Sequence, residues 1–475
     1  MIIKLRKLFF SSILIFLTIL CKKENDIEIN DKSVKSNEKL LFVWEHYRHG
    51  ARDPYIKVDM KTWIDFIGVQ WKSQGELNAL GLRSHYLLGA ATRKKYKDFL
   101  SLKYNPNELF IISTDVNRTI MSAMANLQGI FNNFSTPNLS YNQIEKSKMN
   151  IFNSTYKTRI DEKISKLENS SVQNGISIIP IHLFSKYGLQ FKLNDADYCP
   201  GIQKYKDEAK NQEQVRKILN DFYKYTNDTY GEAIFKFMNI SWEKNPNYIF
   251  EDSNLYYICD AYIADYFAGR DMPHIIMSGL KMKEFYYHAL NHSVIDTYYV
   301  NYGLPPTNAS YITVSPMFRT IFNYMDRRIY INEHSELNDL NTSSPKYVIY
   351  SGHDSTVGAV DVFMNAEYKI PYENPEYTTS LFFELWEIDN KYYIKYLVNL
   401  KEKAFYEYDY FKQNTMDRLF EQNEVEEICL GERNDKTIKK ETIFKTIFFV
   451  VISIAIVCFL LLVVLLILYK KKRVI

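Results

Sequence analysis

Two histidines and two arginines follow a short apolar run near the start of the chain. The run 40–44 leads into His46, Arg48, His49 and Arg52, within the stretch VWEHYRHGARDP. A guanidinium presents a planar fork of N–H donors that matches the oxygens of a tetrahedral oxyanion. Neighbouring cations lower the pKa of an imidazole, which keeps a ring nitrogen unprotonated and nucleophilic. The stretch predicts an anion site with a nucleophilic histidine, and His49 is favoured over His46 because arginines flank it.

Two later segments repeat this arrangement of an apolar run followed by polar residues. The run 109–113 precedes Arg118, and the run 347–350 precedes His353 and Asp354. Continuous apolar runs of this length are typical of strands buried on both faces, as in a parallel sheet covered by helices. Since ligands of open α/β sheets lie beyond the carboxyl ends of the strands, we expect these side chains to converge at one edge.

The converged set fits a phosphate monoester. The three arginines would repel one another unless an anion carrying about two negative charges lay between them, as a phosphate monoester does. We expect His49 to attack phosphorus in line and form a phosphohistidine, while the arginines and His353 hold the equatorial oxygens. Asp354, protonated at rest, would give its proton to the departing alkoxide, which implies an acidic pH optimum and no requirement for a metal.

Each of these residues also has an ordinary structural interpretation. Arg118 could belong to an exposed helix surface, and a His-Asp dipeptide in a loop usually has no catalytic role. His288 and His292 lie four residues apart on an expected helix, as a zinc pair would, but no third ligand accompanies them. The shared position after three apolar runs is what favours a common site.

Composition and cysteine content narrow the class of protein. A formal net charge of +3 on 475 residues is not that of a nucleic-acid binder. Between the apolar ends of the chain lie Cys199, Cys259 and Cys429, which predict one disulfide and one remaining thiol with the pairing left open. The chain has no CxxC pair, so a structural zinc site is not expected.

Both ends of the chain are apolar. Residues 1–21 combine a basic start with an apolar run, which predicts a secretion signal, with an uncleaved anchor as the alternative. Residues 446–469 carry no charge and, at about 1.5 Å per residue, are long enough to cross a bilayer. The basic tail 470–475 would stay cytosolic, which places the body in a lumen or outside the cell. Sequons agree with that location, at Asn117, Asn133, Asn138, Asn153, Asn169, Asn227, Asn239, Asn291, Asn308 and Asn341.

The parts of the chain can be bounded by these patterns. In order, we expect a signal peptide (1–21), a linker (22–39), a folded domain (40–430), a stalk (431–445), a transmembrane helix (446–469) and a cytoplasmic tail (470–475). The α/β core is assigned to about 40–135 and 300–430. Residues 136–300 have helical spacing of Leu, Phe and Tyr, clearest in 213–239, and predict a smaller, mainly helical inserted subdomain. The fold class expected is α/β, with a mostly parallel sheet flanked by helices.

The ordered motifs resemble those of the histidine acid phosphatase family, within the histidine phosphatase superfamily. RHGARDP is similar to the family signature RHGxRxP, and SGHDST at 351–356 is similar to its SAHDTT segment. Segments 75–89, 113–123 and 178–182 resemble further family motifs, as does the Cys199-Pro200 pair.

That resemblance carries implications for site and fold. It implies His49 as the nucleophile and Asp354 as the proton donor. It implies as phosphate-binding residues Arg48, Arg52, Arg118 and His353. It also implies a phosphoglycerate mutase-like α/β domain with a smaller helical domain, no cofactor, and an unglycosylated Asn117 beside the active site. The relatives carry more lumenal cysteines, so none of their disulfide pairings is transferred.

The favoured function is an acid phosphatase acting broadly on phosphate monoesters, in a lysosome or endosome or at the cell surface. The enzymatic alternative is a phytase or another inositol-phosphate phosphatase of the superfamily, which extra cations lining the cleft would favour. The non-enzymatic alternative is a catalytically inactive cell-surface binding protein. The partners expected are a phosphate monoester and a membrane, with a homodimer left open and no nucleic acid.

Overall fold

The computed structural model describes the greater part of the folded body. It covers residues 38–55, 74–131, 139–147, 166–167, 169–171, 178–183, 199–238, 254–269, 282–334, 344–372 and 375–429. From Lys39 on these residues belong to one compact unit. The expected signal peptide, stalk, transmembrane segment 446–469 and tail lie outside the described residues, as do the sequons at Asn133, Asn138, Asn153, Asn239 and Asn341. Within the described ranges, no helix is long and apolar enough to cross a membrane.

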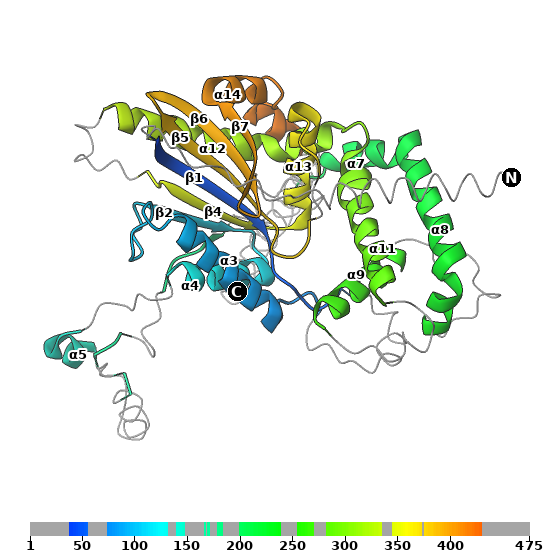
Figure 1. The fold of residues 1–475 in the computed structure, drawn as a ribbon, viewed down its shortest axis with the longest axis horizontal. Helices are drawn as coiled ribbons and strands as arrows, with labels where there is room; N and C mark the ends of the chain where they lie inside the picture. The colour runs from blue at the N-terminus through cyan, green and yellow to red at the C-terminus, as the bar shows by residue number, and fades with distance from the viewer. Residues whose placement is uncertain are drawn as a thin grey trace, which may run out of the picture. The chain divides into compact units, whose positions relative to one another are not determined.

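A seven-stranded sheet forms the centre of the fold, in the order β3-β2-β4-β1-β5-β6-β7 (Figure 1). The strands are β1 Glu38–Arg48, β2 Leu109–Ser113, β3 His182–Leu183, β4 Tyr347–Gly352, β5 Ser380–Ile388, β6 Lys391–Val398 and β7 Lys401–Glu407. β1, β4, β2 and β3 pair in parallel, whereas β5, β6 and β7 pair antiparallel with one another. The α/β class is confirmed, and the antiparallel edge adds to the parallel part that the apolar runs predicted.

The register of the central strands brings three strand ends to the same edge. Arg48 at the end of β1 lies opposite Gly352 of β4, and Ser113 at the end of β2 lies opposite Ser351. Every residue of β4 is buried, as expected for a strand covered on both faces. The segments after these strands therefore start side by side.

Helices cover both faces of the sheet. β1 alternates between the faces: Val43 joins one apolar cluster with Leu127, whereas Phe42 joins a second with Phe318 and Phe363. The first cluster lies under α3 (Ala79–Lys95) and α4 (Asn117–Ile130), and the second under α12 (Asn308–Glu333) and α13 (Asp354–Tyr368). Helix α14 (Tyr408–Met416) also contributes to the second cluster.

The middle of the chain is mainly helical where it is described. It contains α5 (Tyr141–Ser147), α7 (Ile202–Asn211), α8 (Glu213–Met238), α9 (Asn254–Phe267), α11 (Met282–Val294) and the π-helix η5 (Ile295–Val300). α9 and α11 pack together through Tyr262 and Phe285, in a cluster that also includes Ala51 and Tyr377 of the α/β part. This shared cluster joins the helical part to the loop after β1.

The described part of the chain contains one disulfide and one free thiol, as the cysteine count predicted. Cys199 before α7 is bonded to Cys429 near the end of the described chain. Cys259 of α9 is a buried free thiol. The bond joins two cysteines that are 230 residues apart in the sequence, and it links the start of the helical part to the last described residues.

Candidate active site

The loop after β1 holds His49 in a defined orientation. His49 is 2% exposed, and its Nδ1–H donates to the carbonyl oxygen of Gly50 at 2.9 Å. With the proton fixed on Nδ1, the other nitrogen, Nε2, keeps its lone pair. The backbone N–H of Gly50 donates to Ser122 Oγ of α4 at 3.0 Å, which anchors the loop to the neighbouring helix.

Gly50 allows this loop to lie directly against the start of α3. A Cβ atom at Gly50 would lie 2.5 Å from the carbonyl oxygen of Gly81, and one at Gly81 would lie 2.1 Å from that of Ala51. Backbone atoms cannot give way as a flexible side chain can, so the loop and the helix start meet only because both residues are glycine.

The surroundings of His49 keep its imidazole neutral. Burial lowers the pKa of His49 well below its ordinary value, and the nearby positive charges of Arg118, Arg48 and Arg52, together with His353, lower it further. A neutral imidazole with an unprotonated Nε2 is the form that can attack an electrophile.

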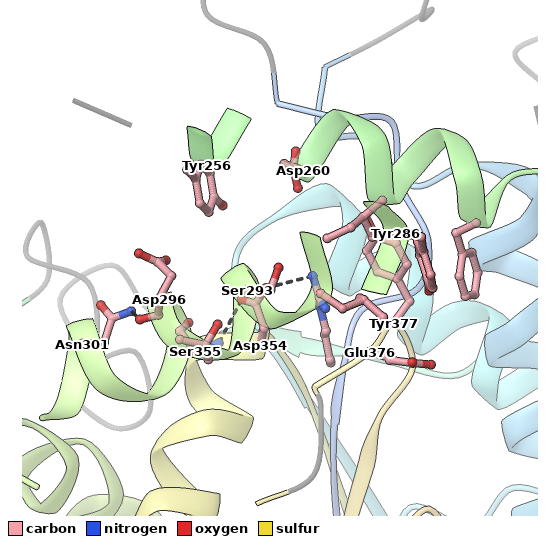
Figure 2. A pocket seen from close by; sticks show the side chains of 15 residues that line it. Tyr256, Asp260, Tyr286, Ser293, Asp296, Asn301, Asp354, Ser355, Glu376 and Tyr377 are labelled. Carbon is pink, nitrogen blue, oxygen red and sulfur yellow. Dashed lines mark hydrogen bonds and ion pairs between the residues drawn. The ribbon is translucent and has the colours of Figure 1, made fainter. Parts of the chain in front are cut away.

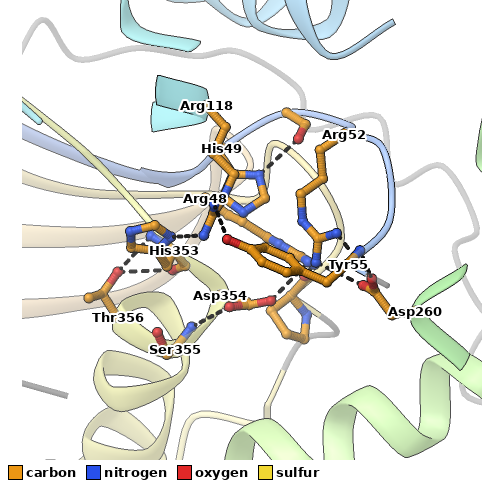
Figure 3. A network of polar contacts seen from close by, with 12 residues as sticks. Arg48, His49, Arg52, Tyr55, Arg118, Asp260, His353, Asp354, Ser355 and Thr356 are labelled. Carbon is orange, nitrogen blue, oxygen red and sulfur yellow. Dashed lines mark hydrogen bonds and ion pairs between the residues drawn. The ribbon is translucent and has the colours of Figure 1, made fainter. Parts of the chain in front are cut away.

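Three guanidinium groups surround this imidazole (Figure 3). Arg48 Nη2 lies 2.8 Å from Asp354 Oδ2, and the Arg48 guanidinium stacks on the ring of Tyr377 at 4.5 Å. Arg118, from the start of α4, approaches His353 Nδ1 at 3.4 Å. No described residue accepts a hydrogen bond from Nε of any of the three arginines, so each retains a buried donor.

Arg52 is held differently from the other two arginines. It is 4% exposed and forms a two-point pair with Asp260 of α9, at 3.1 and 2.8 Å. The ring of Tyr55 lies over Arg52 at 5.2 Å and over Arg118 at 5.6 Å, and its hydroxyl lies 3.4 Å from Arg118 Nη1. Arg48, Arg52 and Arg118, together with His49 and His353, form a group that we call the cradle. Asp260 supplies a counter-charge for this cradle from the helical part.

His353 and Asp354 stand where β4 ends and α13 begins. His353 is the N-cap of α13 in a capping box with Thr356, and its Nε2 lies 2.9 Å from Thr114 Oγ1. Asp354 Oδ1 accepts the backbone N–H of Ser355 at 2.9 Å. The rings of His49 and His353 lie 5.7 Å apart, edge to face, so the ends of β1 and β4 supply adjacent groups.

The charge state of Asp354 differs from the expectation. Burial raises its pKa, but Arg48, His353 and Arg52 outweigh burial, and the net pKa lies below the ordinary value. The prediction of a protonated Asp354 at rest is therefore wrong for the protein without a ligand. The ion pair with Arg48, which the sequence does not reveal, is the physical reason.

The sequence matches a known protein superfamily over most of its length. The family model described as histidine phosphatase superfamily (branch 2) matches residues 39–399. The chain belongs to this superfamily.

Curated relatives share shorter segments with this histidine phosphatase. Lysosomal acid phosphatase of Xenopus laevis is 39% identical over 95 residues, which cover 20% of this chain and 22% of the relative. Human prostatic acid phosphatase is 41% identical over 102 residues, which cover 21% of this chain and 25% of the relative. The matched segments thus span about a quarter of the length of these curated relatives.

Solved structures support the fold. The phytase from Citrobacter braakii has a TM-score of 0.53 at 12% identity, covering 80% of this chain and 98% of that one. Hafnia alvei phytase in complex with tartrate has a TM-score of 0.52 at 12% identity, covering 81% and 98%. At this identity the likeness concerns the architecture alone.

The predicted residues all lie in one place in this histidine phosphatase, whereas His46 and His288 contact residues outside this set. The six that converge are Arg48, His49, Arg52, Arg118, His353 and Asp354. His46 is 1% exposed, lies 3.0 Å from Thr356 Oγ1, and has a pKa lowered by burial to about 3. His288 stacks on Phe222 at 4.4 Å and lies 2.8 Å from Thr226 Oγ1. In the ranges that the structure describes, no three metal-ligating side chains gather.

A cavity of about 180 Å³ adjoins the cradle and was not foreseen from the sequence (Figure 2). Arg48 and Asp354 form part of its wall, and the rest comes from α9, α11, η5 and the loop before β5. Its acidic and aromatic lining includes Asp260, Asp296, Glu376, Tyr256, Tyr286 and Tyr377. None of these residues comes directly after a predicted strand, so the pattern that located the cradle gives no signal for them.

Proposed function

We propose that the chain hydrolyses phosphate monoesters at acidic pH through a phosphohistidine on His49. The observation that carries this proposal is a neutral, buried imidazole with a free Nε2 among three guanidinium groups. The arginines supply the charge that neutralises the phosphoryl oxygens, so the proposed reaction needs no metal. Membership of the histidine phosphatase superfamily supports the same chemistry.

The first half of the proposed reaction transfers the phosphoryl group. Nε2 of His49 forms a bond to phosphorus while the bond from phosphorus to the alcohol oxygen breaks in line. Charge collects on the equatorial oxygens, where the arginines and His353 stabilise it. Asp354 gives its proton to the departing oxygen, so that a neutral alcohol leaves.

The second half regenerates the enzyme. Asp354, now a carboxylate, accepts a proton from a water molecule as that water attacks phosphorus. The bond between phosphorus and Nε2 breaks, inorganic phosphate departs, and Asp354 is protonated again. One carboxyl group thus serves as acid and then as base.

Substrate binding accounts for the proton on Asp354. In the free protein the ion pair with Arg48 lowers its pKa. A bound phosphate dianion engages Arg48 and adds negative charge beside the carboxylate, and both effects raise the pKa of Asp354. The proton is therefore acquired with the substrate, and most readily at acidic pH.

The alternatives have less support. An inositol polyphosphate would require cations around the leaving group, but the described residues lining the cavity contribute carboxylates and only one cation, Arg48. A binding protein without activity would have no use for a neutral His49 inside a cluster of arginines. The described lining of the cavity therefore favours a simple phosphate monoester over an inositol polyphosphate.

We further propose that residues 40–430 form a lumenal or extracellular catalytic domain held by the segment 446–469. The matched relatives are named lysosomal and prostatic acid phosphatases. The disulfide between Cys199 and Cys429 suits an oxidising compartment.

The test uses the full chain in detergent with p-nitrophenyl phosphate, from about pH 4 to pH 8, with and without EDTA. We expect release of p-nitrophenol that is fastest at acidic pH and unchanged by EDTA. An alkaline quench with radiolabelled substrate should trap an acid-labile phosphohistidine. Dependence on an added divalent metal, or no label, would overturn the proposal.

A further inference from the structure

The cavity beside Asp354 is where the alcohol of the substrate must lie. Arg48 lines both the phosphate cradle and this cavity, and Asp354 faces it from the start of α13 (Figure 2). Asp354 protonates the leaving oxygen in the proposed reaction, so the group attached to that oxygen extends into the cavity. The lining of the cavity therefore determines which alcohols are preferred.

The charges of this lining are strongly unbalanced. Two of its carboxylates have partners, since Asp260 pairs with Arg52 and Asp354 pairs with Arg48. Asp296 and Glu376 form no ion pair with any lysine or arginine that the structure describes. A bound phosphate draws on the arginines and leaves these two carboxylates without a directly paired cation among the described residues.

Asp296 is the carboxylate best placed to act on the leaving group. It lies at the start of η5, where the Nδ2–H of Asn301 donates to its backbone oxygen at 2.7 Å and leaves its carboxylate in the cavity (Figure 2). Burial raises its pKa to about 6, the neighbouring Asp354 raises it too, and Lys206 and Lys210 lower it by less. A cation that enters the cavity favours the ionised carboxylate and lowers this pKa, so Asp296 can bind it as a carboxylate at the acidic pH of the proposed reaction.

The aromatic side chains of the cavity suit the same ligand. Tyr377 is 8% exposed, and its hydroxyl has no hydrogen-bond partner among the described residues, although it lines the cavity. Phe267 meets the Tyr377 ring edge to face at 5.3 Å, and Tyr256 and Tyr286 complete the aromatic walls. Aromatic faces beside carboxylates attract ammonium groups.

The cavity has room for a small alcohol. Its volume of about 180 Å³ is well above the roughly 10–15 Å³ that one water molecule needs by the same measure. An aminoethyl or choline group therefore fits within it.

We propose that the preferred substrates are phosphate monoesters of small alcohols that carry an ammonium group, and that Asp296 binds this group. The inference rests on the proposed phosphatase activity and specifies its substrate class. The phosphate lies on the arginines and His49, while the ammonium lies near Asp296, with Glu376 at the rim and the aromatic rings around it.

The test compares two substrates of nearly equal shape with the full chain in detergent. Phosphocholine carries a trimethylammonium group, and 3,3-dimethylbutyl phosphate carries a neutral tert-butyl group in its place. We expect kcat/KM to be at least about tenfold higher for phosphocholine, which corresponds to about 1.4 kcal/mol. If p-nitrophenyl phosphate is hydrolysed but the two esters react equally, this inference fails and the phosphatase activity stands. If p-nitrophenyl phosphate is not hydrolysed, the proposed function itself fails.

Variants of the lining residues then test which residue causes the preference for the ester that carries an ammonium group. The inductive effect of the ammonium on the leaving oxygen is the same in every variant, so a change in the ratio of the two kcat/KM values isolates its binding. Asp296→Asn should lower the ratio severalfold, and Glu376→Gln should lower it less. Glu232→Gln, an exposed change on α8, is the matched control and should leave the ratio unaltered. A high ratio that persists in Asp296→Asn would overturn the assignment of Asp296.

Discussion

The buried ion pair between Arg52 and Asp260 predicts how much folding stability is lost when Arg52 has neither its carboxylate partner nor a bound phosphate. Its two contacts of 3.1 and 2.8 Å are almost fully buried, with side-chain exposures of 5% and 10%. Removing one partner of a buried pair strands the other charge, which costs about 3–5 kcal/mol of folding stability. Asp260→Asn should therefore lower the melting temperature of the free protein by several degrees.

Phosphate should reverse much of this loss. A dianion in the cradle gives Arg52 a new counter-charge, so phosphate stabilises the variant more than the unaltered protein. The same free energy appears in binding, because stability and affinity are linked through one cycle. If about 1.4 kcal/mol is recovered, the inhibition constant for inorganic phosphate falls about tenfold.

The assays are thermal unfolding with increasing phosphate and competitive inhibition by phosphate. Glu421→Gln is the matched control, because it breaks a pair with Arg319 in which the carboxylate is 66% exposed. Such surface pairs contribute about 0–1 kcal/mol to folding stability, so neither the melting temperature nor the inhibition constant for phosphate should change much in this control. A lower melting temperature in Asp260→Asn with unchanged or weaker phosphate inhibition would show that Arg52 supports the fold without binding phosphate.

The same geometry makes three further predictions. His49→Ala should abolish turnover and phosphohistidine labelling in a quench assay, and loss of both in His46→Ala instead would refute the assignment. Asp354→Asn should lower kcat/KM for β-glycerol phosphate by about 10²- to 10⁴-fold but for p-nitrophenyl phosphate far less, because p-nitrophenolate leaves without a proton. An equal fall in kcat/KM for the two substrates would contradict a proton donor. Burial raises the pKa of Glu45 to about 8 despite the hydrogen bond from Tyr347, so the folded state holds a proton that the unfolded state loses above about pH 4.5. The contribution of Glu45 to stability should thus fall as pH rises from about 5 to 8, so the difference in melting temperature between the unaltered protein and Glu45→Gln should fall over that range.

The cradle could be predicted from sequence because its parts obey one rule of sheet geometry. Arg48, Arg118 and His353 each come after an apolar run, and parallel strands bring the residues at their carboxyl ends to a common edge. The short apolar runs therefore predict that residues hundreds of positions apart in the sequence lie close together in the fold. The same rule gave the fold class, since runs buried on both faces require helices on both sides of the sheet.

The cavity could not be predicted in this way. Asp260 and Asp296 lie within α9 and the π-helix η5, where no apolar run followed by polar residues singles them out, and their direction depends on how these helices pack in the folded chain. The charge of Asp354 depends on a 2.8 Å approach by Arg48, which no spacing in the chain encodes. The pairing of Cys199 with Cys429 likewise depends on the folded path between them.

The contact between Gly50 and Gly81 restricts how this protein can vary. Because each main chain occupies the space that the other's side chain would need, no compensating partner exists for a change at either position. Lineages that keep the loop after β1 in this place must keep both residues, and diversification is left to the walls of the cavity. Mutational tolerance should therefore be almost nil at these two positions and considerable a few ångströms away.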